Sequence, residues 1–523
     1  MPPGQPSSPS VQARASSRSG GSLLPTIRLI DGQLPRAVRE AEAALLAANH
    51  SVNHSIYQRG QLVMRPIKPK LKAADDRETF GWRLRRVDVP YLVHAFTRSA
   101  YFERYDARVK DWVNKDCPKQ LAEVYLSLAG GWQLPVLVGI VNTPFLRRDG
   151  SLCERAGYDP ISGLLFIPEQ QVFPAIASKP SRDDALTTLK YLDDTLLGEF
   201  PFVEKIDRSV MLSGFLTALD RRAMDVAPLH GFSSPVAGTG KSLLIDLISI
   251  LLTGHRAPVI SQGKTEEEFE KRLGTSLIAG DNIITIDNCN SELTGVLLCQ
   301  ALTQTLLNVR LLGKSQQVDV PNASTFFANG NNLVVAGDLT RRTLLCQLDA
   351  GVEQPELRTF QRDVIETAYS ERGKLVAAIL TVLRAWHGAS TAIGVDPLGS
   401  FDEWSFRVRS PLLWLDRDDP CDSIKTVREN DPGRSLLNTV LVQWKQNLGT
   451  SSRYTVQDVI ARASVDRDFF AALATIAVSS TGTISNDRLG RWLNKNNNKI
   501  VNRLKLTKVG NSHGYPTWQV AEV

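Results

Sequence analysis

The chain has 523 residues, of which 42% are hydrophobic, and its formal net charge at pH 7 is +6. A chain of this length is expected to hold about three domains, and this composition lets it bury a core. No apolar run approaches the ~20 residues that a membrane span requires, which excludes a membrane-spanning protein. The mild positive charge permits a nucleic-acid partner but does not require one, because basic residues act through clustering.

The cysteines and the N-terminus predict a cytosolic protein. The six cysteines contain no C-x-x-C pair and have no metal-ligand spacing with the seven histidines. We therefore expect reduced thiols. The first 22 residues are rich in Pro, Ser and Gly and hold no aromatic residue. This composition predicts a disordered tail at 1–22 and no secretion signal.

Residues 23–184 are predicted to form an α+β region of unassigned role. A segment rich in Ala and Glu predicts a helix at 35–48. The arginine-rich stretch Trp82–Arg86 could contact DNA, although a solvated strand edge explains it better. This region shows neither paired carboxylates in a polymerase-like pattern nor a zinc motif, so primase chemistry has no support. Residues 185–224 are predicted to be helical.

The next segment has the residues of a loop that holds a nucleoside triphosphate. Gly238 and Gly240 let the backbone turn its N–H groups inward, where a Cβ would block the phosphates. Lys241 would neutralise the β- and γ-phosphate oxygens and Ser242 would offer a hydroxyl to Mg²⁺, at the start of a helix whose dipole favours anions. The usual G-x-x-x-x-G-K-[ST] pattern has glycine where this chain has Pro235. The predicted loop comprises Pro235, Val236, Ala237, Gly238, Thr239, Gly240, Lys241 and Ser242.

Two strands downstream end in polar residues that suit the same site. The apolar run 281–288 predicts a buried strand whose acid, Asp287, would hold the water shell of Mg²⁺. Asn288 stands where a second acid often polarises the attacking water, which leaves the general base open. The run 324–329 ends in Asn329, which would sense the γ-phosphate or orient the water. Because turn formers follow it, a plain turn is the alternative for that residue.

A pair of arginines precedes another apolar strand. Arg341 and Arg342 could reach the nucleotide of a neighbouring subunit and stabilise the transferred charge. Paired arginines on a solvated surface are the alternative. Between the second and third strands, two extended runs within 306–320 surround Gly313-Lys314-Ser315, which predicts a hairpin with a basic tip. Lys314 is thus a candidate DNA contact, unless it is merely solvated.

The C-terminal third divides into three segments. Helical periodicity at 352–388 predicts a lid or packing helix that completes an ATPase domain at 225–395, and 396–434 is predicted to be a linker region without an assigned fold. In 435–523, helices including one capped by Ser485 precede a hairpin, which is the outline of a winged helix. Its basic residues favour phosphate contact, with protein packing as the alternative. The candidates are Arg488, Arg491, Lys495, Lys505 and Lys508.

These motifs carry a family resemblance. In order, G-T-G-K-S, I-I-T-I-D-N, F-F-A-N-G-N-N-L and G-D-L-T-R-R resemble the ATPase core of superfamily 3 helicases and the related poxvirus-type primase-helicases of phages, plasmids and integrated elements. The resemblance is specific over about residues 225–350 and looser over 130–225. It implies an AAA+-like P-loop fold, a hexameric ring on DNA and collar helices at 185–224. It assigns Asn329 as the sensor, Arg342 as the intersubunit finger with Arg341 beside it, and Lys314 to the DNA channel.

The expected protein is therefore an α/β ATPase with an α+β N-terminal region and a winged-helix C-terminus. Its cofactors would be ATP and Mg²⁺, and its function would be that of a DNA helicase or replication-initiation ATPase of a phage or mobile element. Two alternatives stay open. One is a DNA-bound ATPase switch, such as a loader or a transposition or defence regulator. The other is a nucleotide-dependent DNA-binding scaffold, which the asparagine at 288 favours.

Overall fold

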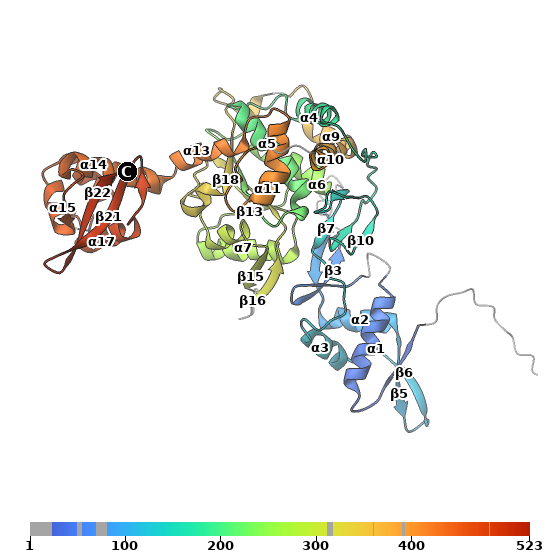
Figure 1. The fold of residues 1–523 in the computed structure, drawn as a ribbon. Coiled ribbons are helices and arrows are strands. Elements are labelled where there is room, and N and C mark those ends of the chain that lie inside the picture. The colour runs from blue at the N-terminus through green and yellow to red at the C-terminus, as the bar shows by residue number, and fades with distance from the viewer. Residues whose placement is uncertain are drawn as a thin grey trace, which may run out of the picture. The chain divides into compact units, whose positions relative to one another are not determined.

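The computed structural model describes residues 24–49, 55–69, 81–310, 317–358, 360–389, 393–480 and 482–523 (Figure 1). The predicted tail at 1–22 and the predicted DNA contact Lys314 lie outside these residues. The chain forms two compact units. The first comprises 1–58, 62–66 and 86–134, and the second comprises 59–61, 67–85 and 135–523.

The first unit packs three helices around a small mixed sheet of order β1-β5-β6. Strand β1 pairs parallel to β5, and β5 pairs antiparallel to β6. The helix predicted at 35–48 is confirmed as α1, and the core includes the buried residues Leu92, Phe96 and Tyr125. Its elements are β1 (Thr26–Leu29), α1 (Leu34–Ala47), α2 (Val89–Ser99), β5 (Tyr101–Asp106), β6 (Asp111–Lys115) and α3 (Lys119–Ser127).

A three-stranded sheet has the strand order β2-β3-β4. These strands are β2 (Tyr57–Arg59), β3 (Leu62–Ile67) and β4 (Arg83–Arg86). The arginine-rich stretch therefore lies on an edge strand, where Arg85 and Arg86 are exposed. This agrees with the solvated strand edge that the sequence favoured. Arg83 differs, because its guanidinium forms an ion pair with Asp281.

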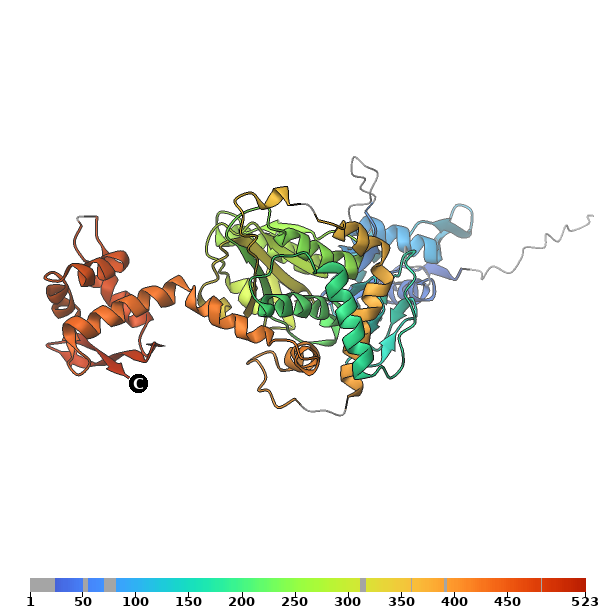
Figure 2. The ribbon, with the colours of Figure 1, turned by 90° about the horizontal axis from the view of Figure 1, so that it is seen from above.

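The second unit is built around a five-stranded sheet in which every strand pair is parallel. Its order is β13-β14-β17-β12-β18, and helices α5 and α6 pack against it (Figure 2). Parallel strands buried on both faces form continuous apolar runs in the sequence, which is why β14, β17 and β18 were predicted. The α/β class is confirmed. The strands are β12 (Leu229–Ser234), β13 (Val259–Ser261), β14 (Ile283–Asp287), β17 (Thr325–Asn331) and β18 (Thr343–Gln347).

Short strands and helices precede and interrupt this sheet. The helices predicted at 185–224 are α4 and α5, and α4 begins with a capping box between Ser181 and Asp184. The elements are β7 (Gly139–Val141), β8 (Phe145–Leu146), β9 (Leu152–Cys153), β10 (Gly157–Asp159), β11 (Leu164–Phe166), α4 (Arg182–Leu196), α5 (Lys205–Asp220), η2 (Arg221–Ala223), α6 (Lys241–Thr253), α7 (Glu266–Ala279) and α8 (Val296–Ala301).

The predicted hairpin between the second and third strands is confirmed in its two strands. Strand β15 (Leu306–Arg310) pairs antiparallel with β16 (Gln317–Pro321), and Arg310 lies opposite Gln317. The six residues that join them, including Lys314, lie outside the described residues. The DNA contact of its tip stays a prediction.

Helices follow the last strand of the sheet. The segment 396–434, expected to be a linker, packs into the same core, where Trp404 is fully buried. Arg407 and Asp220 form a buried ion pair with a separation of 2.6 Å, so this segment is joined to α5 by charge as well as by packing. Its apolar residues lie far apart in sequence from their partners, which hid the packing. The elements are η3 (Gly337–Arg341), η4 (Pro355–Leu357), α9 (Val364–Ser370), α10 (Arg372–Gly388), α11 (Asp402–Trp404), η5 (Ser405–Arg409), α12 (Ser410–Trp414), η6 (Pro420–Asp422) and α13 (Ser423–Glu429).

The C-terminal residues enclose an apolar core of their own around Trp444, Phe469 and Trp518. Four helices precede a long antiparallel hairpin in a sheet of order β19-β22-β21-β20. Ser485 caps α17 by accepting from the backbone N–H of Arg488, as predicted. The elements are α14 (Pro432–Leu448), β19 (Tyr454–Thr455), α15 (Val456–Ala463), α16 (Arg467–Ala477), α17 (Asn486–Lys495), β20 (Ile500–Val501), β21 (Leu504–Ser512) and β22 (Tyr515–Glu522).

Candidate functional site

The glycine-rich loop joins β12 to α6, and both of its glycines need their lack of a side chain. Gly238 and Gly240 have φ values of +77° and +107°. A Cβ on Gly240 would lie 3.0 Å from the Phe200 ring, and one on Gly238 would lie 2.9 Å from Cβ of Glu356. Helix α6 begins directly after the loop, so its free backbone N–H groups face this end of the sheet.

Lys241 is a buried cation held only by neutral oxygens. Lys241 is 8% exposed, and burial lowers the pKa of its ammonium group. The ammonium donates to Ser234 Oγ, to the Val236 carbonyl at 3.1 Å and to Asn331 Oδ1 at 2.8 Å. In the described part of the chain no carboxylate forms an ion pair with it. A buried charge without a counter-ion favours binding of an anion.

Ser242, Asp287 and Asn329 come together in a cavity of about 200 Å³ at the carboxyl edge of the parallel sheet. The amide nitrogen of Asn329 lies 3.3 Å from Ser242 Oγ, and its oxygen accepts from the Asn288 backbone N–H at 3.0 Å. Asn329 is 3% exposed and lies inside β17, so it is not a turn residue.

This residue set fits a hydrated magnesium ion that also binds phosphate. Magnesium is usually held by one or two carboxylates together with phosphate oxygens and water, rather than by a complete protein cage. The Asp287 carboxylate and the Ser242 hydroxyl would hold the ion as such partial ligands. Among the described residues, no group of three or more His, Cys, Asp or Glu side chains could hold a metal ion. The ion would therefore complete its shell with ligand phosphates.

Asp246 and Arg256 also line this cavity, and sequence reasoning missed both. Asp246 follows Ser242 by four residues on α6, so the two side chains share one helix face. Burial raises the pKa of Asp246, and the negative charge of Asp287 adds to the effect. Its carboxylate accepts from the Ala257 backbone N–H at 3.0 Å and lies 3.5 Å from Arg256. The spacing from Ser242 was the available sequence signal. Asn331, a direct partner of Lys241, was missed as well.

Asn288, a predicted catalytic residue, is exposed and has a positive φ of 54°. The side chain of Asn288 ends in an amide, which, unlike a carboxylate, does not take up a proton at neutral pH. Asp246 is the second carboxylate that lines this cavity, beside Asp287.

The two predicted arginines differ in accessibility. The Arg342 side chain is 11% exposed and is tied within its own chain, because it donates to the Cys299 carbonyl at 2.7 Å and pairs with Asp338 at 2.7 Å. The Arg341 side chain is 47% exposed and contacts Asp338 at 2.6 Å. Of the two, Arg341 is therefore the arginine that a neighbouring molecule reaches more easily.

The predicted C-terminal DNA contacts form two groups. Arg488, Arg491 and Lys495 are exposed, and their spacing places them on one face of α17, opposite the buried Leu489 and Leu493. Lys508 is exposed and Lys505 half-buried on β21, the first strand of the hairpin. None of these five basic side chains forms an ion pair with a described residue. Their charges are available to an anionic partner.

Comparisons with known proteins give low similarity. No protein-family model matches the sequence, and no curated protein matches it significantly. An apo structure of the NrS-1 C-terminal region is similar over 92% of this chain and 98% of that one, with 13% identity and a TM-score of 0.37. A structure described as SCCmec type IV Cch, an active helicase, is similar over 85% of this chain and 96% of that one, with 13% identity and a TM-score of 0.33.

In the ranges that the structure covers, no helix combines the length and the apolar character that a bilayer crossing needs.

Proposed function

We propose that this protein is an ATP- and Mg²⁺-dependent motor that acts on DNA as a ring-shaped helicase or replication-initiation ATPase. The observation that carries the proposal is the buried Lys241, which lies at the start of α6 without a carboxylate partner in the described chain. Ser242, Asp287 and Asn329 line one cavity beside it. A cation, partial magnesium ligands and free helix N–H groups together suit a nucleoside triphosphate.

The DNA part of the proposal rests on the exposed basic face of α17 and on the β15–β16 hairpin. Phosphate contacts of this kind give affinity without reading base sequence. The hexameric ring, and the roles of Lys314 and of an arginine from the neighbouring subunit, come from the family resemblance and form part of the same proposal.

The experiment that tests it measures ATP hydrolysis with and without DNA, together with unwinding of a forked duplex. The proposal predicts DNA-stimulated hydrolysis and strand separation, both lost in Lys241→Ala. Lys271→Ala is the control, because this exposed lysine of α7 is ion-paired with Glu267. A folded parent protein that hydrolyses no ATP contradicts the ATPase assignment.

The second candidate is a DNA-bound ATPase switch without strand separation. It would share the nucleotide site with a motor, whereas Asn288 at the end of β14 favours the third alternative, a nucleotide-dependent DNA-binding scaffold, because its amide cannot act as a base. Hydrolysis that DNA stimulates without any unwinding identifies the switch. Lys314→Ala sharpens the distinction, since a motor loses unwinding and DNA stimulation in this variant but keeps its basal hydrolysis.

A further inference from the structure

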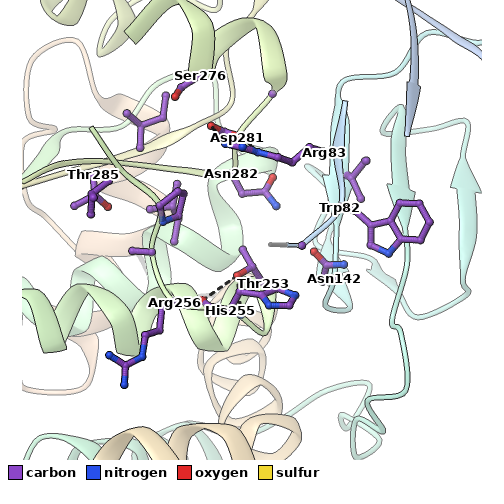
Figure 3. Close-up of a pocket in the computed structure, with 18 of the residues that line it drawn as sticks. Trp82, Arg83, Asn142, Thr253, His255, Arg256, Ser276, Asp281, Asn282 and Thr285 are labelled. Atoms are coloured by element: carbon purple, nitrogen blue, oxygen red, sulfur yellow. Dashed lines mark hydrogen bonds and ion pairs between the residues drawn. The ribbon is translucent and has the colours of Figure 1, made fainter. Parts of the chain in front are cut away.

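A second, larger cavity of about 760 Å³ lies next to the site of Ser242 and Asp287 (Figure 3). All of its lining residues belong to the second compact unit. It shares Arg256, Val259 and Thr285 with the smaller cavity, so the two hollows have a common wall. Its volume falls in the range that holds a drug-sized ligand.

Three polar groups on its wall have unused hydrogen-bonding capacity. The Thr285 residue is 1% exposed, and its hydroxyl has no partner among the described residues. The Asn142 amide nitrogen donates to the Ile167 carbonyl at 3.0 Å, which leaves its oxygen as an acceptor. The Asn282 amide oxygen accepts from the Arg222 guanidinium, which can only donate, so its NH₂ group is left as a donor.

These groups lie among fixed neighbours. In Figure 3 the Asn142 and Asn282 amides lie between the Arg83–Asp281 pair and the hydrogen-bonded Thr253 and His255. Trp82 also lines the cavity, together with Asn142. The cavity thus combines an aromatic plane with one donor, one acceptor and one hydroxyl.

The cavity does not suit a phosphate. Arg83 donates to both oxygens of Asp281 at 3.0 and 2.8 Å, so its charge is neutralised. Arg256 is paired with Asp246 and points away from the two amides in Figure 3. This differs from the neighbouring site, where the charge of Lys241 has no carboxylate partner. A neutral ligand therefore fits the larger cavity better than an anion.

We propose that this cavity binds a nucleobase. A nucleobase is neutral and planar, can stack on an indole, and presents adjacent donors and acceptors to amide groups. Its source is either a free nucleoside or one base of a DNA strand. This site goes beyond the proposed nucleotide site, because it does not use the phosphate loop.

The first test measures binding of adenosine, guanosine, cytidine and thymidine by equilibrium dialysis. The full-length protein carries Lys241→Ala, so that the phosphate loop contributes little. Added Thr285→Val preserves side-chain shape, removes one hydroxyl and should weaken binding about tenfold. Trp82→Ala should weaken it at least as much. Thr325→Val is the matched control, because this buried threonine of the adjacent strand β17 also has a hydroxyl without a partner among the described residues, and does not line the cavity.

The second test distinguishes the two sources. A single-stranded oligonucleotide is compared with its abasic counterpart, in the same background and with the same threonine variants. Nucleoside binding that falls in Thr285→Val but not in Thr325→Val identifies a free nucleoside as the ligand. Absence of nucleoside binding, with oligonucleotide affinity that requires both the base and Thr285, identifies a base of a strand. If Thr285→Val changes neither kind of binding, the proposal is wrong.

Discussion

The carboxyl edge of the parallel sheet and the outer face of α17 present positive charge in opposite ways. Lys241 is buried, is held by three oxygen atoms and occupies one position. Arg488, Arg491 and Lys495 are exposed and form no ion pair with the described residues. A buried cation at a fixed position recognises one anionic group in one geometry. Exposed cations add a diffuse attraction that falls with salt.

The largest expected effect tests the buried member of this contrast. Lys241→Ala should reduce ATP hydrolysis below detection, because nothing else in the described loop neutralises phosphate charge. Since the lysine has no ion-pair partner there to lose, the melting temperature should stay close to that of the parent. Calorimetry and a phosphate-release assay measure both quantities. A folded variant that keeps its turnover removes the ATPase assignment.

The arginines test whether the buried site is complete within one chain. An arginine supplied by a neighbour contributes about 10³-fold or more to hydrolysis, so loss of the acting residue should reduce the rate by that factor. In an equal mixture of such a variant with Lys241→Ala chains, about a quarter of the interfaces in a head-to-tail ring pair an intact loop with an intact arginine. The mixture should therefore regain up to about a quarter of the parent's hydrolysis.

Arg341→Ala and Arg342→Ala are mixed separately, because Arg341 is the more exposed of the two and Arg342 is tied to Cys299. If hydrolysis is restored in only one of the two mixtures, the arginine changed in that mixture is the one that acts on the neighbouring subunit's nucleotide. If neither mixture regains activity although rings form, the site is not shared between subunits.

Asp246 gives a smaller, pH-dependent effect. Asp246→Asn should lower hydrolysis about 100-fold, at the low end of the usual contribution of a general acid or base. Burial raises the pKa of Asp246 in the folded protein above its value in the unfolded chain. As pH rises, the unfolded chain therefore loses this proton first, and the free energy of unfolding falls between the unfolded and the folded pKa. The variant should therefore gain melting temperature relative to the parent from acidic to neutral pH.

Asp183→Asn serves as a control for this experiment, because it changes an exposed aspartate in the first turn of α4. A stability difference between Asp246→Asn and the parent that is constant across pH contradicts the buried, ionisable role of Asp246.

The exposed member of the contrast should give the smallest effect for each residue. Each change of Arg488, Arg491 or Lys495 to Gln should weaken duplex binding a few-fold and reduce the slope of log K against log salt by about 1. Base preference should stay the same, because phosphate contacts do not read sequence. Lys445→Gln is the control, since Lys445 of α14 is ion-paired with Glu522. An unchanged salt slope in the triple variant removes this face as a DNA contact.

Local signals in the sequence were sufficient for much of the fold. Strands β14, β17 and β18 appeared as apolar runs because both of their faces are buried, and the glycines of the phosphate loop marked positions with positive φ. The cap at Ser485 and the pairing of the strands on either side of residues 311–316 follow from contacts between near neighbours in sequence. Such features depend on interactions between residues that lie close together in the chain, so the sequence alone predicts them.

Tertiary structure decided what depends on distant partners. Asp246 lines the same cavity as Asp287 only because the sheet places α6 beside β14. The segment 396–434 became part of the core because Trp404 and Arg407 contact α5, about 190 residues earlier in the chain. Asn142 and Asn282 line one cavity although 140 residues separate them. The periodicity of a sequence does not predict such pairs. Packing and the burial of paired charges depend on which residues the fold brings together, however far apart they lie in the sequence.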